Sequence, residues 1–325
     1  MKIYFIINPN AKNGRCQVIW RTIEKGLEEK GISFLAFFTE YPGHAREIAE
    51  AISKQADSQP IAIAAVGGDG TLHEVINGTA GYKNVSVGFI PGGSGNDFSR
   101  GFNIPKESAA ALELFLREYS SNGIKIDTGK IRYNDFCETY FMNNMGVGFD
   151  AVIAREANDS GVKKLFNRMS LGRLVYAYIL MKKLVTYRCV PIDLSVDGRK
   201  YEFDSAWFVT ISNQPFFGGG MKISPGAKPA DGLLDITVVH RLSRLKLLVV
   251  FISVFWGKHT VFKEVQQLRG RSISIESPLE ILAHADGEVI GNTPLQIEVC
   301  PKSLRIISGN KHEGHTEELK IDDCH

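Results

Sequence analysis

The feature that most constrains the fold is a glycine-rich turn between an apolar run and a helix-like segment. Residues 61–66 (IAIAAV) predict a buried strand, and the GGDGT sequence of residues 67–71 follows directly. Leu72, Val75 and Ile76 then recur at the spacing of one helix face. Because glycines allow an anion to approach the backbone and a helix N-terminus offers unpaired N–H groups, this strand–turn–helix unit predicts a phosphate site.

Strand-like and helix-like segments alternate through residues 1–124, which predicts a mainly parallel sheet covered by helices on both faces. The expected strands are 3–7, 32–38, 61–66 and 85–90, and the expected helices are 16–30, 44–54, 72–79 and 108–119. In such sheets, ligands bind beyond the carboxyl ends of the strands. The turns at 8–10, 67–71 and 91–96 follow three of these strands, so we expect them to converge at one edge.

A second pattern begins at residue 125, where short β-type runs follow one another. These runs predict an antiparallel β domain over residues 125–302, and Asp197-Gly198 is a hairpin signal within it. Helix-like stretches at 163–187 and 243–256 interrupt the strands. Residues 303–310, with a last strand at 303–307, can complete the first domain, and we expect the polar residues 311–325 to be a disordered tail.

Composition indicates an ordinary globular protein. Hydrophobic residues make up 44% and charged residues 23% of the chain, and the formal net charge of +2 gives no reason to expect nucleic acid. The five cysteines are scattered without a metal-ligand spacing, so we expect the protein to reside in a reducing cytosol. Residues 1–7 run into Asn8-Pro9 without a cleavage pattern, so no signal peptide is expected. The longest apolar run, 247–256, is shorter than the ~20 residues that a membrane span needs.

Asp69 gives the first turn its chemistry. A carboxylate among phosphates repels them unless a metal ion lies between, so Asp69 suggests Mg²⁺ or proton acceptance. The turn is not a Walker A loop, because no G-x-x-x-x-G-K-[ST] occurs in the chain. It is not a dinucleotide fingerprint either, because His73 stands where the third glycine would be. The alternative is a tight turn in which Asp69 caps the helix.

A second glycine turn, PGGSGNDF at residues 91–98, follows the next strand and also opens a helix. Its glycines, Gly93 among them, and the side chains of Ser94 and Asn96 would supply donors for a second part of a polyphosphate. One such loop is an ordinary strand-to-helix connection. Two of them after consecutive strands favour a nucleotide site.

These two turns resemble those of the diacylglycerol kinase catalytic-domain family, which includes soluble bacterial lipid kinases and the sphingosine and ceramide kinases. The similarity extends over nearly the whole chain. It includes Asn8-Pro9, Gly67-Gly68-Asp69-Gly70-Thr71, Asn77-Gly78, residues 91–98, 146–151 and 231–235, and Asp286-Gly287-Glu288. NAD kinases and 6-phosphofructokinases share versions of the GGDGT turn, but its combination with the later motifs points to lipid kinases.

The resemblance implies an ATP site in the cleft between an α/β nucleotide-binding domain, like those of NAD kinases and diacylglycerol kinases, and an antiparallel β-sandwich domain with helical insertions. The residues that would line the nucleotide are Asn8, Thr39, Gly67, Gly68, Asp69, Gly70, Thr71, Leu72, His73, Gly93, Ser94 and Asn96. Asp69 would act beside the transferred phosphate through Mg²⁺, and Glu288 would accept the proton of the lipid hydroxyl. For His73, we expect packing or capping rather than catalysis.

The resemblance also implies a structural Mg²⁺ held by the Asp231 side chain and the carbonyl oxygens of Lys228 and Leu233. An aspartate with free carbonyls in a turn is an oxygen-rich site of the kind that Mg²⁺ prefers. From the residues alone, a solvated turn carboxylate is the simpler interpretation for both Asp231 and Glu288.

The leading hypothesis is an ATP-dependent lipid kinase that phosphorylates the hydroxyl of diacylglycerol or a related membrane lipid. The alternatives are an NAD kinase-like enzyme and a nucleotide-binding regulator without catalysis. Apolar segments with basic flanks, at 163–183 and 241–258, suit peripheral docking on anionic lipid, or are core helices with solvated ends. We therefore expect a cytoplasmic enzyme that meets its lipid at the membrane surface, without a nucleic-acid partner. A homodimer is possible from the sequence.

Overall fold

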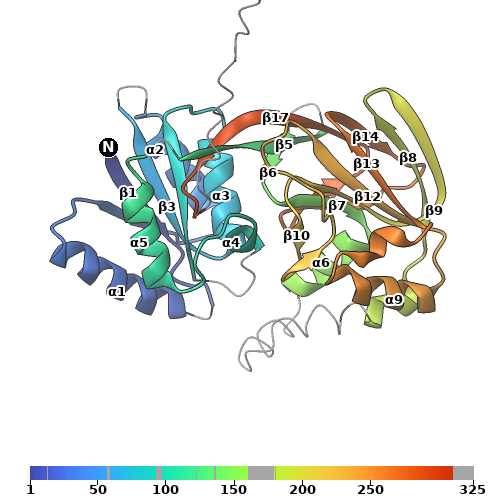
Figure 1. Cartoon of the computed structure of the whole chain (residues 1–325), viewed down its shortest axis with the longest axis horizontal. Helices are drawn as coiled ribbons and strands as arrows, with labels where there is room; N and C mark the ends of the chain where they lie inside the picture. Colours follow the sequence, from blue (N-terminus) through green and yellow to red (C-terminus); the bar gives the residue numbers. More distant parts are fainter. Residues whose placement is uncertain are drawn as a thin grey trace, which may run out of the picture.

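The computed structural model describes residues 1–12, 14–56, 59–92, 97–121, 123–134, 137–159, 179 and 181–309. Figure 1 shows an α/β half formed by the N-terminal part of the chain beside a β-rich half formed by the rest. Two long strands, β5 (Ile124–Asn134) and β17 (Leu295–Ile306), run between the halves along one side of the molecule. This arrangement confirms the expected fold class.

A parallel sheet with the strand order β4-β3-β1-β2 forms the centre of the N-terminal half. Its strands are β1 (Lys2–Ile7), β2 (Leu35–Phe38), β3 (Ile61–Gly67) and β4 (Val85–Pro91). The helices of this half are α1 (Arg15–Glu29), α2 (His44–Ser53), α3 (Asp69–Thr79), α4 (Asp97–Gly101) and α5 (Ser108–Glu118). Val66 pairs with both Ile7 and Ile90, so the carboxyl ends of β1, β3 and β4 are level. The turns after these strands therefore begin at one edge of the sheet, as the sequence predicts.

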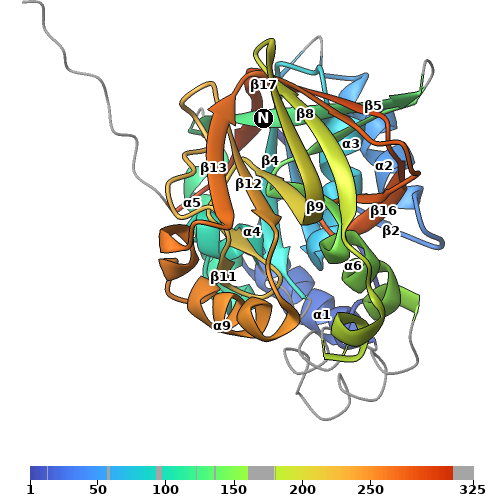
Figure 2. The same ribbon diagram turned by 90° about the vertical axis from the view of Figure 1, so that its right-hand side faces the viewer.

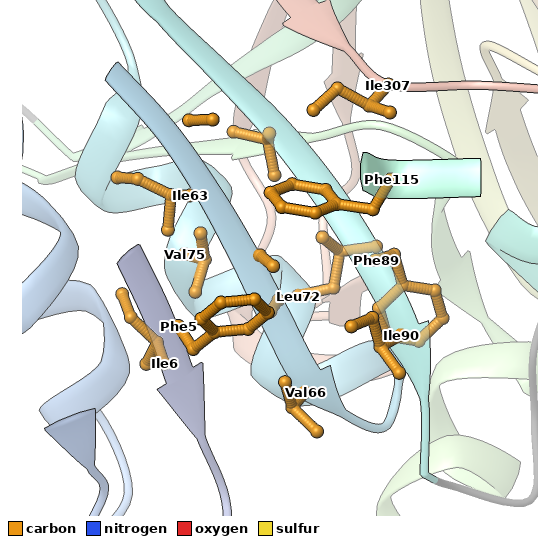
Figure 3. Close-up of a cluster of buried hydrophobic side chains, with 14 of the residues drawn as sticks. Phe5, Ile6, Ile63, Val66, Leu72, Val75, Phe89, Ile90, Phe115 and Ile307 are labelled. Atoms are coloured by element: carbon orange, nitrogen blue, oxygen red, sulfur yellow. The ribbon is translucent and has the colours of Figure 1, made fainter. Parts of the chain in front are cut away.

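The core of this half surrounds the strands β3 and β4. β3 and β4 are buried at every position, which fits their unbroken runs of apolar and small residues. Figure 3 shows Leu72 and Val75 of α3, Phe115 of α5 and Phe5 of β1 packed around them. A Cβ atom on Gly88 of β4 would lie 2.3 Å from the Phe115 ring, so a glycine is needed there for α5 to pack this closely.

Antiparallel strands build the C-terminal half, which faces the viewer in Figure 2. They are β6 (Cys137–Phe141), β7 (Asn144–Gly148), β8 (Val190–Val196), β9 (Arg199–Ser212), β12 (Leu234–His240), β13 (Val265–Gly270), β14 (Ser272–Glu276), β15 (Leu282–Ala285), β16 (Glu288–Asn292) and the separate pair β10 (Phe216–Phe217) and β11 (Met221–Lys222). The expected two-residue turn, Asp197-Gly198, joins β8 to β9 with both residues at positive φ. The helices of this half include α6 (Phe149–Asp159), α9 (Arg244–Val254) and the 3-10 helix η1 (Lys258–Val261).

β17 joins the two halves. It pairs antiparallel with β14 and β5, and at its end Arg305 and Ile306 pair in parallel with Ser86 and Val87 of β4. The sequence predicts separate strands at 296–299 and 303–307, but the structure has one strand with a register shift after Cys300. β9 is likewise one strand where the pattern predicts two, at 200–203 and 207–212. Both differences arise because pairing with the neighbouring strand resumes, after a register shift, beyond the residues that suggested a break.

Some predictions fall on residues that the structure does not describe. Most of the helix expected at 163–187 lies there, although residues 181–186 within it are helical. The expected tail at 311–325 lies outside the described residues as well. So do Gly93, Ser94 and Asn96, the predicted phosphate contacts of the second glycine turn. The helix expected at 243–256 corresponds to α9.

Candidate active site

The carboxyl ends of the parallel strands bring three predicted nucleotide residues together. Asn8 follows β1, and its Nδ2 donates to Thr71 Oγ1 at 3.1 Å, across the first turn of α3. The Asn8 N–H donates to the Val66 carbonyl at 3.0 Å. Thr39 follows β2, and its N–H donates to the Ile7 carbonyl at 2.8 Å. Asn8, Thr39 and Thr71 are therefore neighbours at one edge, although they come from three different connections.

The N-terminus of α3 is open. Gly68 is the N-cap residue, in an extended conformation and without a side-chain cap, and Asp69 is the first residue of the helix. The structure thus excludes the alternative in which Asp69 caps this helix. The N-terminus of a helix has N–H groups and a partial positive charge that suit an anion. Leu72, predicted to line the nucleotide, has its side chain in the core, so its part in such a site would fall to its backbone.

The glycines of this edge are required by packing. A Cβ atom on Gly67 would lie 2.5 Å from Thr71 Oγ1. The Gly92 N–H donates to the Gly67 carbonyl at 2.6 Å, and a Cβ atom on Gly92 would lie 2.8 Å from Cys16 Sγ. These contacts hold Gly92, at the start of the second glycine turn, directly against Gly67 of the first. Burial raises the pKa of the Cys16 thiol to about 11, so it remains a neutral, packed group.

Glu288 reaches the GGDGT turn from the other half of the molecule. It is the first residue of β16, directly after the tight turn formed by Asp286 and Gly287, which both have positive φ. A Cβ atom on Gly70 would lie 3.0 Å from Glu288 Oε1, so this carboxylate lies against the first turn of α3. The structure therefore places Glu288 next to the residue that follows Asp69. These two carboxylates are 219 positions apart in the chain, by subtraction of their residue numbers.

The turn that carries Glu288 is clamped through Asp286. The Asp286 carboxylate accepts N–H groups from Met142, Asn143 and Asn144 at 3.1, 2.9 and 3.2 Å. The fourth partner is His73, whose Nδ1 lies 3.0 Å from Asp286 Oδ2. The His73 ring thus points from α3 toward the C-terminal half. This orientation supports the expected packing role of His73.

Comparison with known proteins decides the family. A family model described as the diacylglycerol kinase catalytic domain matches residues 2–131, and one described as the YegS C-terminal NAD kinase beta sandwich-like domain matches residues 143–308. A Bacillus subtilis (strain 168) protein named "Putative lipid kinase YtlR" is 33% identical over 308 residues, which cover 93% of this chain and 98% of the relative.

The chain belongs to the diacylglycerol kinase family of lipid kinases. A Mycobacterium tuberculosis protein named "Diacylglycerol kinase" is 29% identical, over 94% of each chain. A solved structure described as a putative diacylglycerol kinase from Bacillus anthracis str. Sterne superimposes with a TM-score of 0.73 at 26% identity, over 94% of this kinase and 96% of the other chain.

A second contact joins the halves of this kinase at α4. Asp97 accepts from Arg100 Nη1 at 2.6 Å and from the Gly219 N–H at 2.7 Å, in the connection between β10 and β11. Burial raises the pKa of Asp97, while the Gly219 and Gly220 N–H groups and Arg100 act in the opposite direction. Asp97 therefore fixes the end of the second glycine turn to the C-terminal half.

The predicted structural Mg²⁺ site lies in the connection before β12, where the Gly232 N–H donates to Asp127 Oδ2 of β5 at 2.7 Å. Asp231 Oδ1 accepts the Leu233 N–H at 3.1 Å, and Asp231 Oδ2 forms an ion pair with Arg269. Lys228 precedes them in the same connection. Among the described residues, no group of three or more His, Cys, Asp or Glu side chains could hold a metal ion. The oxygen donors suit Mg²⁺ in kind. In this structure the Arg269 guanidinium pairs with Asp231 Oδ2.

Asn77 is a connecting residue for which the sequence suggests no role. Its Nδ2 donates to the Tyr140 carbonyl at 3.0 Å, while its Oδ1 accepts from the Tyr140 N–H at 2.8 Å and from Thr139 Oγ1 at 3.0 Å. The available signal is its spacing, because Asn77 lies one helical turn after His73 on the same face of α3. The two residues together attach α3 to β6 and to the turn before β16.

A buried polar group supports the other side of this turn. His284 Nδ1 accepts the Gly287 N–H at 3.3 Å, and its ring stacks on Phe217 with centroids 5.4 Å apart. Behind it, Asp150 accepts from Thr210 Oγ1 at 3.0 Å and from the Ala151 N–H at 2.8 Å. Asp150 is buried among protein partners, which gives it a structural role.

Proposed function

We propose that this kinase transfers the γ-phosphoryl group of ATP to the hydroxyl of diacylglycerol or a related membrane lipid, at the edge between α3 and the turn before β16. The observation that carries the proposal is the position of Glu288 against Gly70, next to Asp69. This position brings Glu288, the candidate proton acceptor of the C-terminal half, next to the GGDGT turn of the N-terminal half. Sites between two halves of a chain are common for such ligands.

The nucleotide side of the proposed site is built by the N-terminal half. Asn8, Thr39 and the residues of the GGDGT turn share the carboxyl edge of the sheet, where α3 begins after the N-cap residue Gly68. The N–H groups at a helix N-terminus suit the oxygens of a phosphate chain. Mg²⁺ bound with the nucleotide would neutralise charge on the transferred group. Asp69 would hold that ion, since a carboxylate among phosphates repels them unless a metal ion lies between.

The acceptor side is built by the C-terminal half. Glu288 would accept the hydroxyl proton as the lipid oxygen forms its bond to the γ-phosphorus, and the bond from that phosphorus to the β–γ bridging oxygen breaks. Asp286 fixes the backbone that positions Glu288 through its three N–H partners. Positioning matters because phosphoryl transfer depends on alignment and charge more than on covalent catalysis.

We also propose that Asp231 and the carbonyl oxygens of Lys228 and Leu233 bind a structural Mg²⁺ in exchange for the Arg269 contact. Thermal unfolding in a Mg²⁺ titration tests this directly. We expect Mg²⁺ to raise the melting temperature of wild type but not of Asp231→Asn. An equal rise in both proteins would exclude Asp231 as a ligand.

The experiment that tests the proposed reaction is a panel of acceptors with radiolabelled ATP. The panel contains diacylglycerol, ceramide, phosphatidylglycerol and a polyprenol in mixed micelles, with NAD as the competing acceptor. We expect label in at least one lipid and a loss of ~100-fold or more in Asp69→Asn. Label in NAD alone, or full activity of Asp69→Asn, would contradict the proposal.

A further inference from the structure

One face of α9 is apolar and exposed. Leu247, Val250 and Val254 of this helix are buried in the core. The opposite face is formed by Leu245, Val249, Ile252, Phe255 and Trp256, which are 79%, 56%, 58%, 44% and 67% exposed. We call these five residues the α9 stripe. Leu245, Val249, Ile252 and Trp256 follow one another at three or four positions, which keeps them on one side of the helix and of the turn that follows it, and Phe255 borders them.

Basic side chains border the α9 stripe. Arg244 lies at its start, and Lys258 and Lys263 lie beyond its end, all three exposed. The acidic neighbour Glu264 is already paired with Lys246, at 2.6 Å. Val261, 80% exposed, extends the apolar surface into η1. An apolar face with basic edges is complementary to an anionic lipid surface.

The inner face of α9, opposite the α9 stripe, packs toward the candidate active site. On its inner side, α9 packs Phe251 and Val254 against Met221 and Phe217 of the β10–β11 pair. Phe217 in turn stacks on His284, beside the turn that carries Glu288. Figures 1 and 2 both place α9 at the lower end of the C-terminal half, with α6. A surface bound by α9 would therefore be connected to the acceptor side of the site through two layers of side chains.

We propose that the α9 stripe docks this kinase on an anionic lipid bilayer, with Trp256 and its neighbours inserted at the level of the headgroups. None of the described helices is long and apolar enough to cross a membrane, which fits insertion at the surface. This proposal deepens the proposed function. It rests on that function, because a kinase that acts on a membrane lipid must meet a bilayer. It assigns a surface that the active-site geometry alone does not require.

Tryptophan fluorescence tests insertion. The chain has three tryptophans, and Trp20 and Trp207 are each only 2% exposed. A blue shift on adding phosphatidylcholine–phosphatidylglycerol vesicles would therefore report Trp256 entering an apolar environment. We expect this shift in wild type, a smaller one with phosphatidylcholine alone, and none in Trp256→Phe. An unshifted wild-type spectrum would overturn the proposal.

Vesicle sedimentation gives the matched mutational test. The triple variant Val249→Ser/Ile252→Ser/Trp256→Ser should lose ~10-fold or more in binding, since each change removes apolar area from the docking face. The control, Leu35→Ser/Leu279→Ser, alters residues that are equally apolar and exposed but lie elsewhere, and it should bind as wild type does. Binding of the triple variant equal to wild type would contradict the account. A second result would also contradict it: a wild-type protein that is a dimer and a triple variant that is a monomer. The α9 stripe would then bind a second copy of the chain instead of a bilayer.

Failure of the docking proposal is distinguishable from failure of the reaction. Transfer to a short-chain diacylglycerol dispersed below its micelle concentration requires no bilayer, so we expect it to be unchanged in the triple variant. Transfer to diacylglycerol in vesicles should fall in parallel with sedimentation. If the wild-type protein binds vesicles but phosphorylates no lipid, the docking proposal stands and the proposed reaction is wrong.

Discussion

His73 Nδ1 lies 3.0 Å from Asp286 Oδ2, and this contact joins α3 to the turn before β16. The side chain of Asp286 is almost completely buried, and its other partners are three backbone N–H groups. The carboxylate is therefore a shared anchor. It holds β7 and the Glu288 turn on one side and the helix that carries Asp69 on the other.

The first prediction concerns this anchor. His73→Leu should lower the free energy of unfolding by about 1–3 kcal/mol, because a buried carboxylate loses one partner while its desolvation remains. Chemical denaturation measures this loss. His73→Gln is the control, since its amide can still donate to Asp286 and should recover part of the stability. Equal stability of His73→Leu and wild type would show that the contact contributes nothing.

Asn77 gives the second prediction. Asn77→Leu removes the side-chain bonds to Thr139 and Tyr140, and should cost about 2–4 kcal/mol of unfolding free energy, because the backbone of β6 loses its partners. Asn77→Asp keeps the acceptor for the Tyr140 N–H but loses the donor to its carbonyl. It should be intermediate, and the order of the three proteins in a denaturation series is the measurement.

The third prediction separates packing from catalysis at the glycine turn. Gly70→Ala places a Cβ atom 3.0 Å from Glu288 Oε1, the free end of a flexible side chain, in a residue that is already helical. We expect little change in stability but a fall of ~10-fold or more in transfer rate, since the carboxylate must move away. Gly67→Ala meets the fixed Thr71 side chain instead and should destabilise the fold by about 1–3 kcal/mol.

Gly26→Ala is the matched control for both glycine variants. It lies in α1, where an added Cβ atom meets nothing within 4 Å. It should be neutral or stabilise by up to about 1 kcal/mol, because alanine is the better helix former. A transfer rate for Gly70→Ala as high as that for Gly26→Ala would argue against the Glu288 position.

The fourth prediction follows from Cys16. Burial raises its pKa from 9.0 to about 11, so between these values the folded state keeps the proton and the unfolded state releases it. The fold should therefore lose stability as the pH rises from 9 toward 11, and Cys16→Ser should reduce that loss. At neutral pH, thiol reagents should label Cys16 only after unfolding. Rapid labelling of Cys16 in the native protein would contradict its burial.

The sequence predicts the strands and helices of the N-terminal half well, because their signals are local. A buried parallel strand such as β3 is an unbroken apolar run, and the turn after it consists of glycines with a helix pattern behind them. The convergence of Asn8, Thr39 and the GGDGT turn then follows from parallel strand order. The Asp197-Gly198 hairpin is equally local, since two residues determine its turn type.

What the sequence does not predict is pairing over long distances. The resemblance implies that Glu288 and Asp69 share one cleft, but nothing in the residues near Glu288 indicates that it lies against Gly70. Nothing near Asp286 indicates that its partners are three backbone N–H groups and His73. The Arg269 partner of Asp231 is also distant in the chain, so the turn alone suggests a free carboxylate. On α9, the apolar run cannot tell which residues face the core, because both of its faces are apolar.

The most direct test of the central claim is transfer from radiolabelled ATP to diacylglycerol in mixed micelles by wild type and by Glu288→Gln, with ATP affinity measured in parallel by calorimetry. Glutamine keeps the shape of the side chain but cannot accept the hydroxyl proton. We predict label on the lipid with wild type and a loss of ~100-fold or more with Glu288→Gln, at unchanged ATP affinity. Equal rates for the two proteins would contradict the account.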